Sequence, residues 1–248
     1  MTTNGFIIYL ALAASSILNI IVPISGSVTV TPFLAILTDP HRAIGLASFY
    51  FLLSGIIRVY LFRKNIQWHE IKILLPLSLI AAFIGSLSLV AINRTLLLVI
   101  VLVFTVYFLL KRVKVLSSAN NKKIKPHYAT GFVGLLSGLL QGAGLAGSDL
   151  RNSYLFGKDL NIAQVHGTTA LVGSSIFLLT TFVRLQTDQL TVPDLIPLLY
   201  IFPFILVGTL LGRMTLYKFS EKTTNAIVVV VMVAIVVFLS QKVLAGIF

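Results

Sequence analysis

The chain has 248 residues, of which 57% are hydrophobic and 10% charged, and its mean hydropathy is +1.00. A soluble fold cannot bury that much apolar surface, and apolar stretches of about 20 residues recur along the whole length. The net charge of +12 arises mostly in short loops between these stretches, which is the positive-inside pattern and indicates lipid headgroups, not nucleic acid, as the partner. The absence of cysteine excludes disulfides, thiolate metal sites and a cysteine nucleophile.

The first half of the chain begins with an apolar segment at residues 6–22. The residues before it lack the basic region of a secretory signal, so we expect the segment to be retained. Pro23, Gly26 and Pro32 then interrupt the apolar pattern, and because proline removes a backbone donor, they predict a broken helix or a re-entrant piece. Further spans are predicted at residues 43–62, 71–92 and 95–110.

A basic linker at residues 111–127 carries six Lys or Arg residues and no acid, and we expect it to face the cytoplasm. It separates a first transmembrane repeat, residues 1–110, from a second, residues 128–248. The second repeat has apolar segments at residues 128–146, 163–183, 192–213 and 223–243. Eight spans with the N-terminus inside put eleven Lys or Arg residues in cytoplasmic loops and seven outside. A broken element that turned back would change this parity and make the two halves inverted copies.

The second repeat opens with the most unusual stretch of the sequence. Its first glycines are spaced three or four residues apart, so they line one helix face and allow a neighbouring backbone to approach: Gly131, Gly134, Gly138 and Gly142. Gly142, Gly144 and Gly147 are then too dense for a regular helix, and five polar residues follow within six positions, from Ser148 to Ser153. This pattern predicts a discontinuous transmembrane helix that lines a binding site.

The two repeats share several features in the same order. Gly26-Ser27 corresponds to Gly147-Ser148, the basic loop at Arg63 to that at Arg184, and the mid-span glycine Gly85 to Gly208. We therefore predict an all-α integral membrane fold with about eight transmembrane helices in two related halves, each with a glycine- or proline-broken or re-entrant element.

Three ionisable residues lie closest to the second glycine break. Asp149 and Arg151 either lie at the site, as charges at membrane depth usually do, or form a solvated surface pair. His166 either carries a proton or only caps and packs the next span. Asp149 and His166 are thus the candidates for proton coupling. Arg58 and Arg184 fall near span ends, where we expect them to reach toward headgroups.

Hydroxyls and free backbone amides at a helix start can bind oxyanions, because the unsatisfied N–H groups and the positive end of the helix dipole point the same way. Serine and threonine in membrane helices also often only bond back to their own backbone. The predicted substrate-binding residues are Ser25, Gly26, Ser27, Thr29, Gly147, Ser148, Arg151, Asn152, Thr168 and Thr169. No metal or cofactor site is predicted.

Several short segments carry a family resemblance. In the second half they are GLLSGLLQGAGLAGS at residues 134–148 and VHGTTAL at 165–171; in the first half they are PISGSVTVTP at 23–32, Ala47-Ser48 and IQW at 66–68. Their order resembles the TauE/SafE family of membrane permeases, also called sulfite exporters, over nearly the full chain. The resemblance implies transport of small sulfur-containing anions such as sulfite, sulfonates or related organic acids. The chain departs from the family pattern in both halves. The first keeps only Gly26 of a glycine triplet, and the second has Gly144-Leu145-Ala146-Gly147 in place of the triplet and residues 149–152 in place of the usual proline.

These observations predict a multi-pass protein of the plasma membrane that acts as a secondary transporter, an exporter, of a small anion. Two alternatives are a passive, channel-like anion facilitator and a non-transporting membrane subunit that assembles other proteins. An enzyme is not expected, because the sequence shows no paired catalytic carboxylates and no metal ligand set. A homodimer is compatible with the sequence, which does not determine the oligomeric state.

Overall fold

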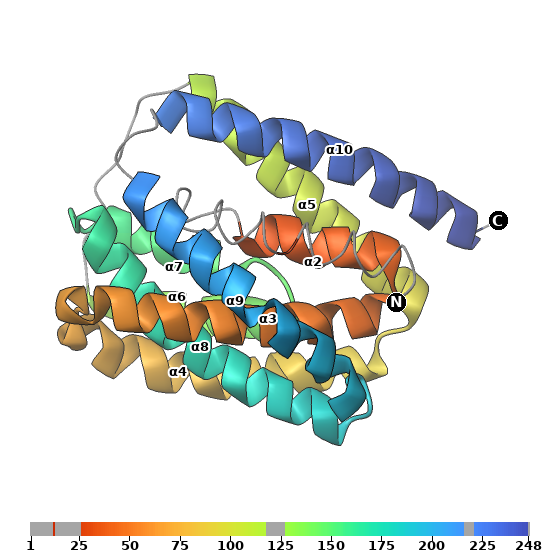
Figure 1. Ribbon diagram of the computed structural model, residues 1–248, viewed down its shortest axis with the longest axis horizontal. Coiled ribbons are helices and arrows are strands. Elements are labelled where there is room, and N and C mark those ends of the chain that lie inside the picture. Colours follow the sequence, from red (N-terminus) through yellow and green to blue (C-terminus); the bar gives the residue numbers. More distant parts are fainter. Residues whose placement is uncertain (1–11, 13–25, 118–126, 216–220, 248) are drawn as a thin grey trace.

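The computed structural model describes Leu12 and residues 26–117, 127–215 and 221–247, and these ranges are helical, without a strand (Figure 1). The helices are α2 (Gly26–Leu37), α3 (Pro40–Phe62), α4 (Trp68–Ser88), α5 (Arg94–Ser117), α6 (His127–Gly142), α7 (Gly147–Phe156), α8 (Ile162–Gln186), α9 (Val192–Thr215) and α10 (Glu221–Ile247). Short 3-10 turns follow α3 at Arg63–Asn65 and α4 at Leu89–Ala91.

Six of the described helices are long and apolar enough to cross a membrane, namely α3, α4, α5, α8, α9 and α10. They confirm the predicted membrane character and the spans at 43–62, 71–92, 95–110, 163–183, 192–213 and 223–243. Helix α5 runs to Ser117, so the start of the basic linker is helical. The segment at 6–22 and Pro23 lie outside the described residues. Pro32 does not end a helix, because it lies inside α2.

Local sequence explains where the central helices α3 and α8 begin. The carboxylate of Asp39 accepts hydrogen bonds from the backbone N–H groups of His41 and Arg42, and Pro40 occupies the first turn. Asn161 and Gln164 form a reciprocal capping box at the start of α8. Both helices therefore begin at side chains that satisfy their free N–H groups.

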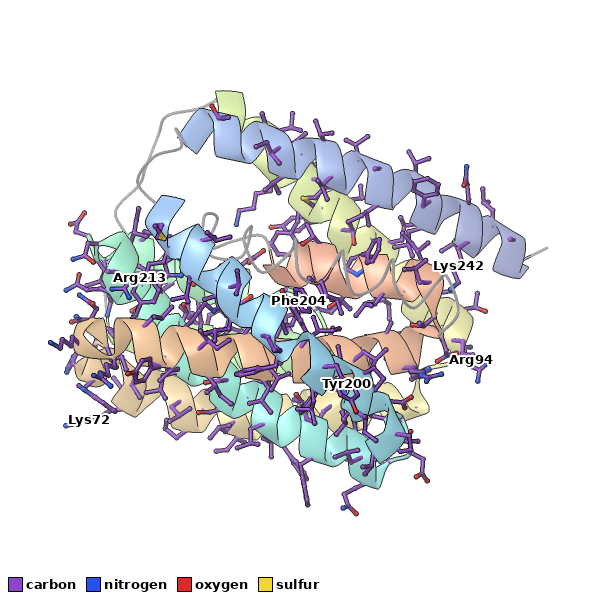
Figure 2. The ribbon with its side chains drawn as sticks, in the orientation of Figure 1. Lys72, Arg94, Tyr200, Phe204, Arg213 and Lys242 are labelled. Atoms are coloured by element: carbon purple, nitrogen blue, oxygen red, sulfur yellow. The ribbon has the colours of Figure 1, made fainter. Side chains whose placement is uncertain are left out.

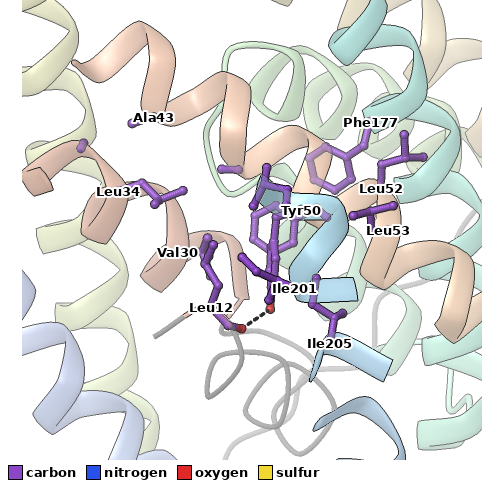
Figure 3. Close-up of a cluster of buried hydrophobic side chains, with 14 of the residues drawn as sticks. Leu12, Val30, Leu34, Ala43, Tyr50, Leu52, Leu53, Phe177, Ile201 and Ile205 are labelled. Carbon is purple, nitrogen blue, oxygen red and sulfur yellow. Dashed lines mark hydrogen bonds between the residues drawn. The ribbon is translucent and has the colours of Figure 1, made fainter. Parts of the chain in front are cut away.

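Helices α3 and α8 pack against each other in opposite directions at the centre of the molecule (Figure 1). Gly55 lies against Ser174, and Gly167, nearer the start of α8, lies against Phe62, nearer the end of α3. The main apolar cluster lies beside this pair and includes Tyr50, whose hydroxyl donates to the carbonyl of Leu12 at 3.1 Å (Figure 3). The pair thus forms the scaffold around which α2, α4 and α9 are placed.

Helix α6 packs its glycine face directly on α4. A Cβ at Gly138 would lie 2.3 Å from the carbonyl oxygen of Ser78, and one at Gly142 would lie 2.2 Å from that of Ala82. Helix α4 contributes Gly85, where a Cβ would lie 2.3 Å from the carbonyl oxygen of Leu139. The predicted close approach of a neighbouring backbone to this face is confirmed.

Helices α6 and α7 form a hairpin that enters and leaves at the same end of the molecule. Lys158, just after α7, lies 2.6 Å from Glu70 in the first turn of α4 and 3.4 Å from the hydroxyl of Thr130 in the first turn of α6. At 16 and 10 residues, the two helices are also too short to span a bilayer separately. The loop after α7 therefore lies at the same end as the turn between α3 and α4. The predicted crossing at 128–146 is wrong, and the re-entrant alternative describes this element.

The two ends of the molecule differ in charge (Figure 2). Lys72 and Arg213 lie at the end that holds the α3–α4 turn, whereas Arg94 and Lys242 lie at the opposite end. At that opposite end the cations have partners: Arg94 pairs with Asp39 at 2.9 Å, and Lys242 donates to the last carbonyls of α2, including those of Ala35 and Thr38. The end that holds the α3–α4 turn is therefore the more basic one, and we call it the basic end.

Candidate functional site

The glycine break between α6 and α7 is required by its backbone geometry. Gly144 has a φ of +73°, and a Cβ there would lie 2.3 Å from Ile44 of α3. A Cβ at Gly147 would lie 2.0 Å from the carbonyl oxygen of Ser137, so α7 begins against the last turns of α6. The break therefore folds the polar start of α7 back onto α6 and presses both against α3.

Arg151, on α7, is fully buried and makes two side-chain hydrogen bonds. Its guanidinium donates to the hydroxyl of Ser137 at 3.2 Å and to Oε1 of Gln141 at 2.5 Å, both on α6. A Cβ on Gly173, next to the midpoint of α8, would lie 3.6 Å from the same guanidinium. Arg151 therefore lies beside the middle of a helix that is long and apolar enough to cross a bilayer. The alternative of a solvated surface pair is excluded, since Asp149 is also buried.

Arg184 is the second fully buried arginine, and the prediction that it reaches toward headgroups is wrong. Its guanidinium donates to the carbonyls of Ile44 at 3.0 Å and Gly142 at 2.8 Å, and to the hydroxyl of Ser48. The carbonyl of Gly142 is one of the free acceptors at the end of α6, and a cation is favoured there by the helix dipole. Arg184 therefore joins α8 to α3 and to the glycine break.

The buried centre carries more positive than negative charge. Arg58 of α3 is half-buried, and its Nε is shielded from solvent. Arg151 interacts electrostatically with both Asp149 and Arg58. Of the chain's seven acidic residues, Asp149 is the one near Arg151. The others whose side chains the structure describes lie toward helix ends or in loops. Arg151 thus has one carboxylate and one further guanidinium within electrostatic range, while Arg184 is buried without a carboxylate partner among the described residues, in a region of low dielectric.

Two small hollows adjoin the glycine break. One, of about 10 Å³ of water-accessible volume, is lined by residues of α2, α3, α6 and α8, among them Thr31, Ser48, Gln141 and Phe177, together with Gly144. The other, of about 20 Å³, lies between the break and α5 and shares Thr31 and Gly144. Each volume is about that of one water molecule. The break of the second half and helix α2 of the first half therefore meet at a common cavity.

The structure does not bring the start of α8 to these hollows. The hydroxyl of Thr168 accepts a hydrogen bond from the backbone N–H of Gln67 at 3.0 Å, and that of Thr169 donates to the carbonyl of Val165 at 2.6 Å. His166 is buried and stacks on Phe62, with ring centroids 5.2 Å apart. Gly173 lies about 6–10 Å further along the helix than these three residues, so they lie away from Arg151. Thr168 and His166 contact the α3–α4 turn and the end of α3.

The other predicted site residues divide between the two halves. Asn152 is buried on α7 beside Arg151, Gly147 begins α7, and Ser148 is partly buried there. Gly26 begins α2 and Thr29 is buried on it, close in sequence to cavity-lining Thr31. Ser25 and the side chain of Ser27 lie outside the described residues. Over the part of the chain that the structure describes, no cluster of His, Asp and Glu could hold a metal ion.

The sequence interpretation missed Gln141, Ser137, Thr31 and Arg184. Gln141 and Ser137 carry a readable signal, since they are the polar residues in an otherwise apolar, glycine-spaced run and fall one helical turn apart. Arg184 has no such signal, because its position near a span end is equally typical of a residue that contacts headgroups.

Comparison with known proteins places the chain in a family. No curated protein and no solved structure matches it significantly. The family described as sulfite exporter TauE/SafE, whose members are membrane transporters of sulfur-containing anions, matches residues 7–239, which is nearly the whole chain. The chain is a multi-pass membrane protein and belongs to the TauE/SafE sulfite exporter family.

Proposed function

We propose that this protein is a secondary transporter that exports a small sulfur-containing anion, sulfite or a sulfonate, across the plasma membrane, and that the anion binds at the glycine break between α6 and α7. The description of the family supports the proposed direction and substrate class, and the buried residues described above support the proposed location of the site.

One observation carries the proposal, namely the excess of buried positive charge next to the cavity. An unpaired charge in a bilayer costs several kcal/mol, so buried arginines normally have carboxylate partners. Asp149 lies near Arg151, but neither Arg58 nor Arg184 forms an ion pair with a carboxylate among the described residues. A bound anion supplies the missing negative charge, and the site binds it by long-range attraction from guanidinium groups whose hydrogen bonds already hold the cavity walls.

The placement of the two broken elements supports alternating access. The α6–α7 hairpin enters from the basic end, whereas α2 ends at the opposite end, where Lys242 caps it. The antiparallel packing of α3 on α8 agrees with two halves related as inverted copies. In such an arrangement the site lies between the halves, and a rocking motion opens it to one side at a time. We place the basic end in the cytoplasm, following the positive-inside rule.

The size of the hollows favours a transporter over a channel. Volumes of about 10 and 20 Å³ hold water but not sulfite, so the wall must open before the anion enters. We propose that Gly147, Ser148, Arg151 and Asn152 of α7, with Thr29 of α2, form the anion site. Thr168 bonds the α3–α4 turn instead, and Thr169 bonds back to its own helix. Asp149, beside Arg151, is the better candidate for proton coupling than the stacked His166.

The test is sulfite flux into proteoliposomes that contain the purified protein. We expect saturable, gradient-dependent flux for the wild type, and a KM at least tenfold higher for Arg151→Gln, which removes one buried positive charge. Lys72→Gln removes the same charge from the exposed surface and should behave as the wild type. Flux that never saturates would identify a channel, and an absence of flux across a panel of sulfur-containing anions would identify an assembly subunit. An unchanged KM for Arg151→Gln would remove the site from this location.

A further inference from the structure

Gln141 has an environment that no other buried amide of the described chain shares. It lies in the last turn of α6, it is 1% exposed, and it lines the smaller hollow together with Thr31 and Ser48. We infer that the side-chain amide of Gln141 is the group that donates hydrogen bonds to the transported anion. This inference rests on the proposed function of the same site.

The orientation of the amide follows from its partner. Arg151 donates from its guanidinium to Gln141 at 2.5 Å, and a guanidinium has donors but no acceptor. The atom that faces Arg151 must therefore be the carbonyl oxygen, Oε1. This assignment follows from the hydrogen bond and does not depend on telling the oxygen and nitrogen of the amide apart by shape. Nε2, with its two N–H groups, is consequently the part of the amide that Arg151 does not bond. A Cβ on Gly173 would lie 3.7 Å from Nε2, so α8 leaves room beside it.

The amide nitrogen is a donor without an acceptor. Nε2 of Gln141 is buried and makes no hydrogen bond with any residue that the structure describes. Leaving such a donor unpaired costs about 1–3 kcal/mol, so a buried amide normally has a partner. Gln141 is one of the residues that line the hollow at the glycine break. An oxygen of a bound oxyanion would satisfy Nε2 there.

The geometry also assigns distinct roles to the two side chains. Arg151 supplies charge and fixes the amide, but its guanidinium is already engaged by Ser137 and Gln141. Gln141 offers a neutral N–H donor at the cavity wall, and an anionic oxygen accepts such a bond more strongly than a hydroxyl does. The site therefore favours substrates that present an anionic oxygen, as a sulfite or sulfonate group does.

Two substitutions test this assignment in sulfite-loaded proteoliposomes. Gln141→Met keeps the volume and removes the donors, and we expect the KM for sulfite to rise about 10- to 100-fold, the factor for one hydrogen bond to a charged group. Gln141→Glu keeps an acceptor for Arg151, which preserves folding, but offers the anion a carboxylate. It should reduce sulfite flux at least as strongly while the melting temperature in detergent stays at or above that of the wild type. Gln186→Met, at an exposed position at the end of α8, is the matched control and should transport as the wild type does.

The outcomes separate this inference from the function on which it rests. A wild-type protein without any flux of sulfite or methanesulfonate would overturn the proposed function and this assignment with it. A wild type that transports sulfite, with Gln141→Met or Gln141→Glu retaining the wild-type KM, would overturn the role of Gln141 alone. If Gln141→Met fails to fold, the Gln141→Glu variant decides: folded and inactive supports the assignment, and folded with normal flux contradicts it.

Discussion

The two fully buried arginines are bound in different ways. Arg184 donates to two backbone carbonyls, of Ile44 and Gly142, as well as to Ser48. Arg151 donates only to side chains among its hydrogen bonds described here, those of Ser137 and Gln141. A backbone carbonyl cannot change its position unless its helix moves, whereas a side chain can rotate. The difference indicates that Arg184 maintains the fold around the glycine break and that Arg151 belongs to the part that responds to a ligand.

The largest effect on stability is expected for Arg184→Gln. This substitution leaves the carbonyls of Ile44 and Gly142 buried without their shared donor, and each orphaned carbonyl costs about 1–3 kcal/mol. We expect the free energy of unfolding to fall by about 2–5 kcal/mol, measured as thermal unfolding of the purified protein in detergent. A variant that melts with the wild type would show that Arg184 does not hold the break.

Arg151→Gln should affect transport more than stability. Its acceptors are side chains that can turn toward each other, so we expect a loss of about 1 kcal/mol or less in stability and a large rise in the KM for sulfite. Thermal unfolding in detergent measures the first effect, and sulfite flux in proteoliposomes measures the second. If Arg151→Gln unfolds as readily as Arg184→Gln, the two arginines are both structural and the comparison fails.

Removing one serine acceptor from each arginine gives a finer test. Ser137→Ala removes an acceptor of Arg151, and Ser48→Ala removes one of Arg184. Ser137→Ala should weaken sulfite binding by about 1 kcal/mol, which is seen as a higher KM. Ser48→Ala should reduce stability by about 1 kcal/mol, which is seen as a lower melting temperature. Equal effects of both serines on the melting temperature would contradict separate roles.

The sequence predicted those features that depend on local pattern. The spacing of Gly134, Gly138 and Gly142 predicted a helix face without side chains, and that face lies on α4. The density of Gly144 and Gly147 predicted an interrupted helix, because a positive φ is readily adopted only by glycine. Both patterns are read over a few residues, so no knowledge of the tertiary structure is needed.

Features that depend on distant contacts could not be predicted. Whether the polar stretch after the break crosses the membrane or returns is decided by Lys158 and Glu70, which are 88 positions apart in the chain. Arg184 likewise depends on carbonyls of α3 and α6, and its sequence position alone fits a headgroup contact equally well. The predicted roles of Thr168 and Thr169 rested on helix-start chemistry, whereas the partners of their hydroxyls are the backbone groups of Gln67 and Val165.

The smallest effect on stability is expected at the ion pair between Lys158 and Glu70. Burial lowers the pKa of Lys158, but the hydrogen bond to Glu70 and the interactions with Glu70 and Tyr154 outweigh it and raise that pKa. A raised pKa means that the pair stabilises the fold at neutral pH and loses its effect as the pH rises through the raised value, above the ordinary lysine pKa of about 10.4. Glu70→Gln removes the charge but keeps an acceptor, and because both side chains are partly exposed we expect a loss of about 0.5–1 kcal/mol at pH 7.

The pH dependence of Glu70→Gln then decides what the pair does. Since Lys158 follows α7 directly, the ion pair fastens the returning arm of the hairpin to α4. The difference in melting temperature between Glu70→Gln and the wild type should be present at pH 7 and disappear once Lys158 is deprotonated, while Lys72→Gln, on the same helix but exposed, should show no difference at either pH. A difference that persists unchanged at high pH would mean that packing, and not charge, holds the hairpin at this end. The hairpin would then differ from both arginine sites in needing no ionised group.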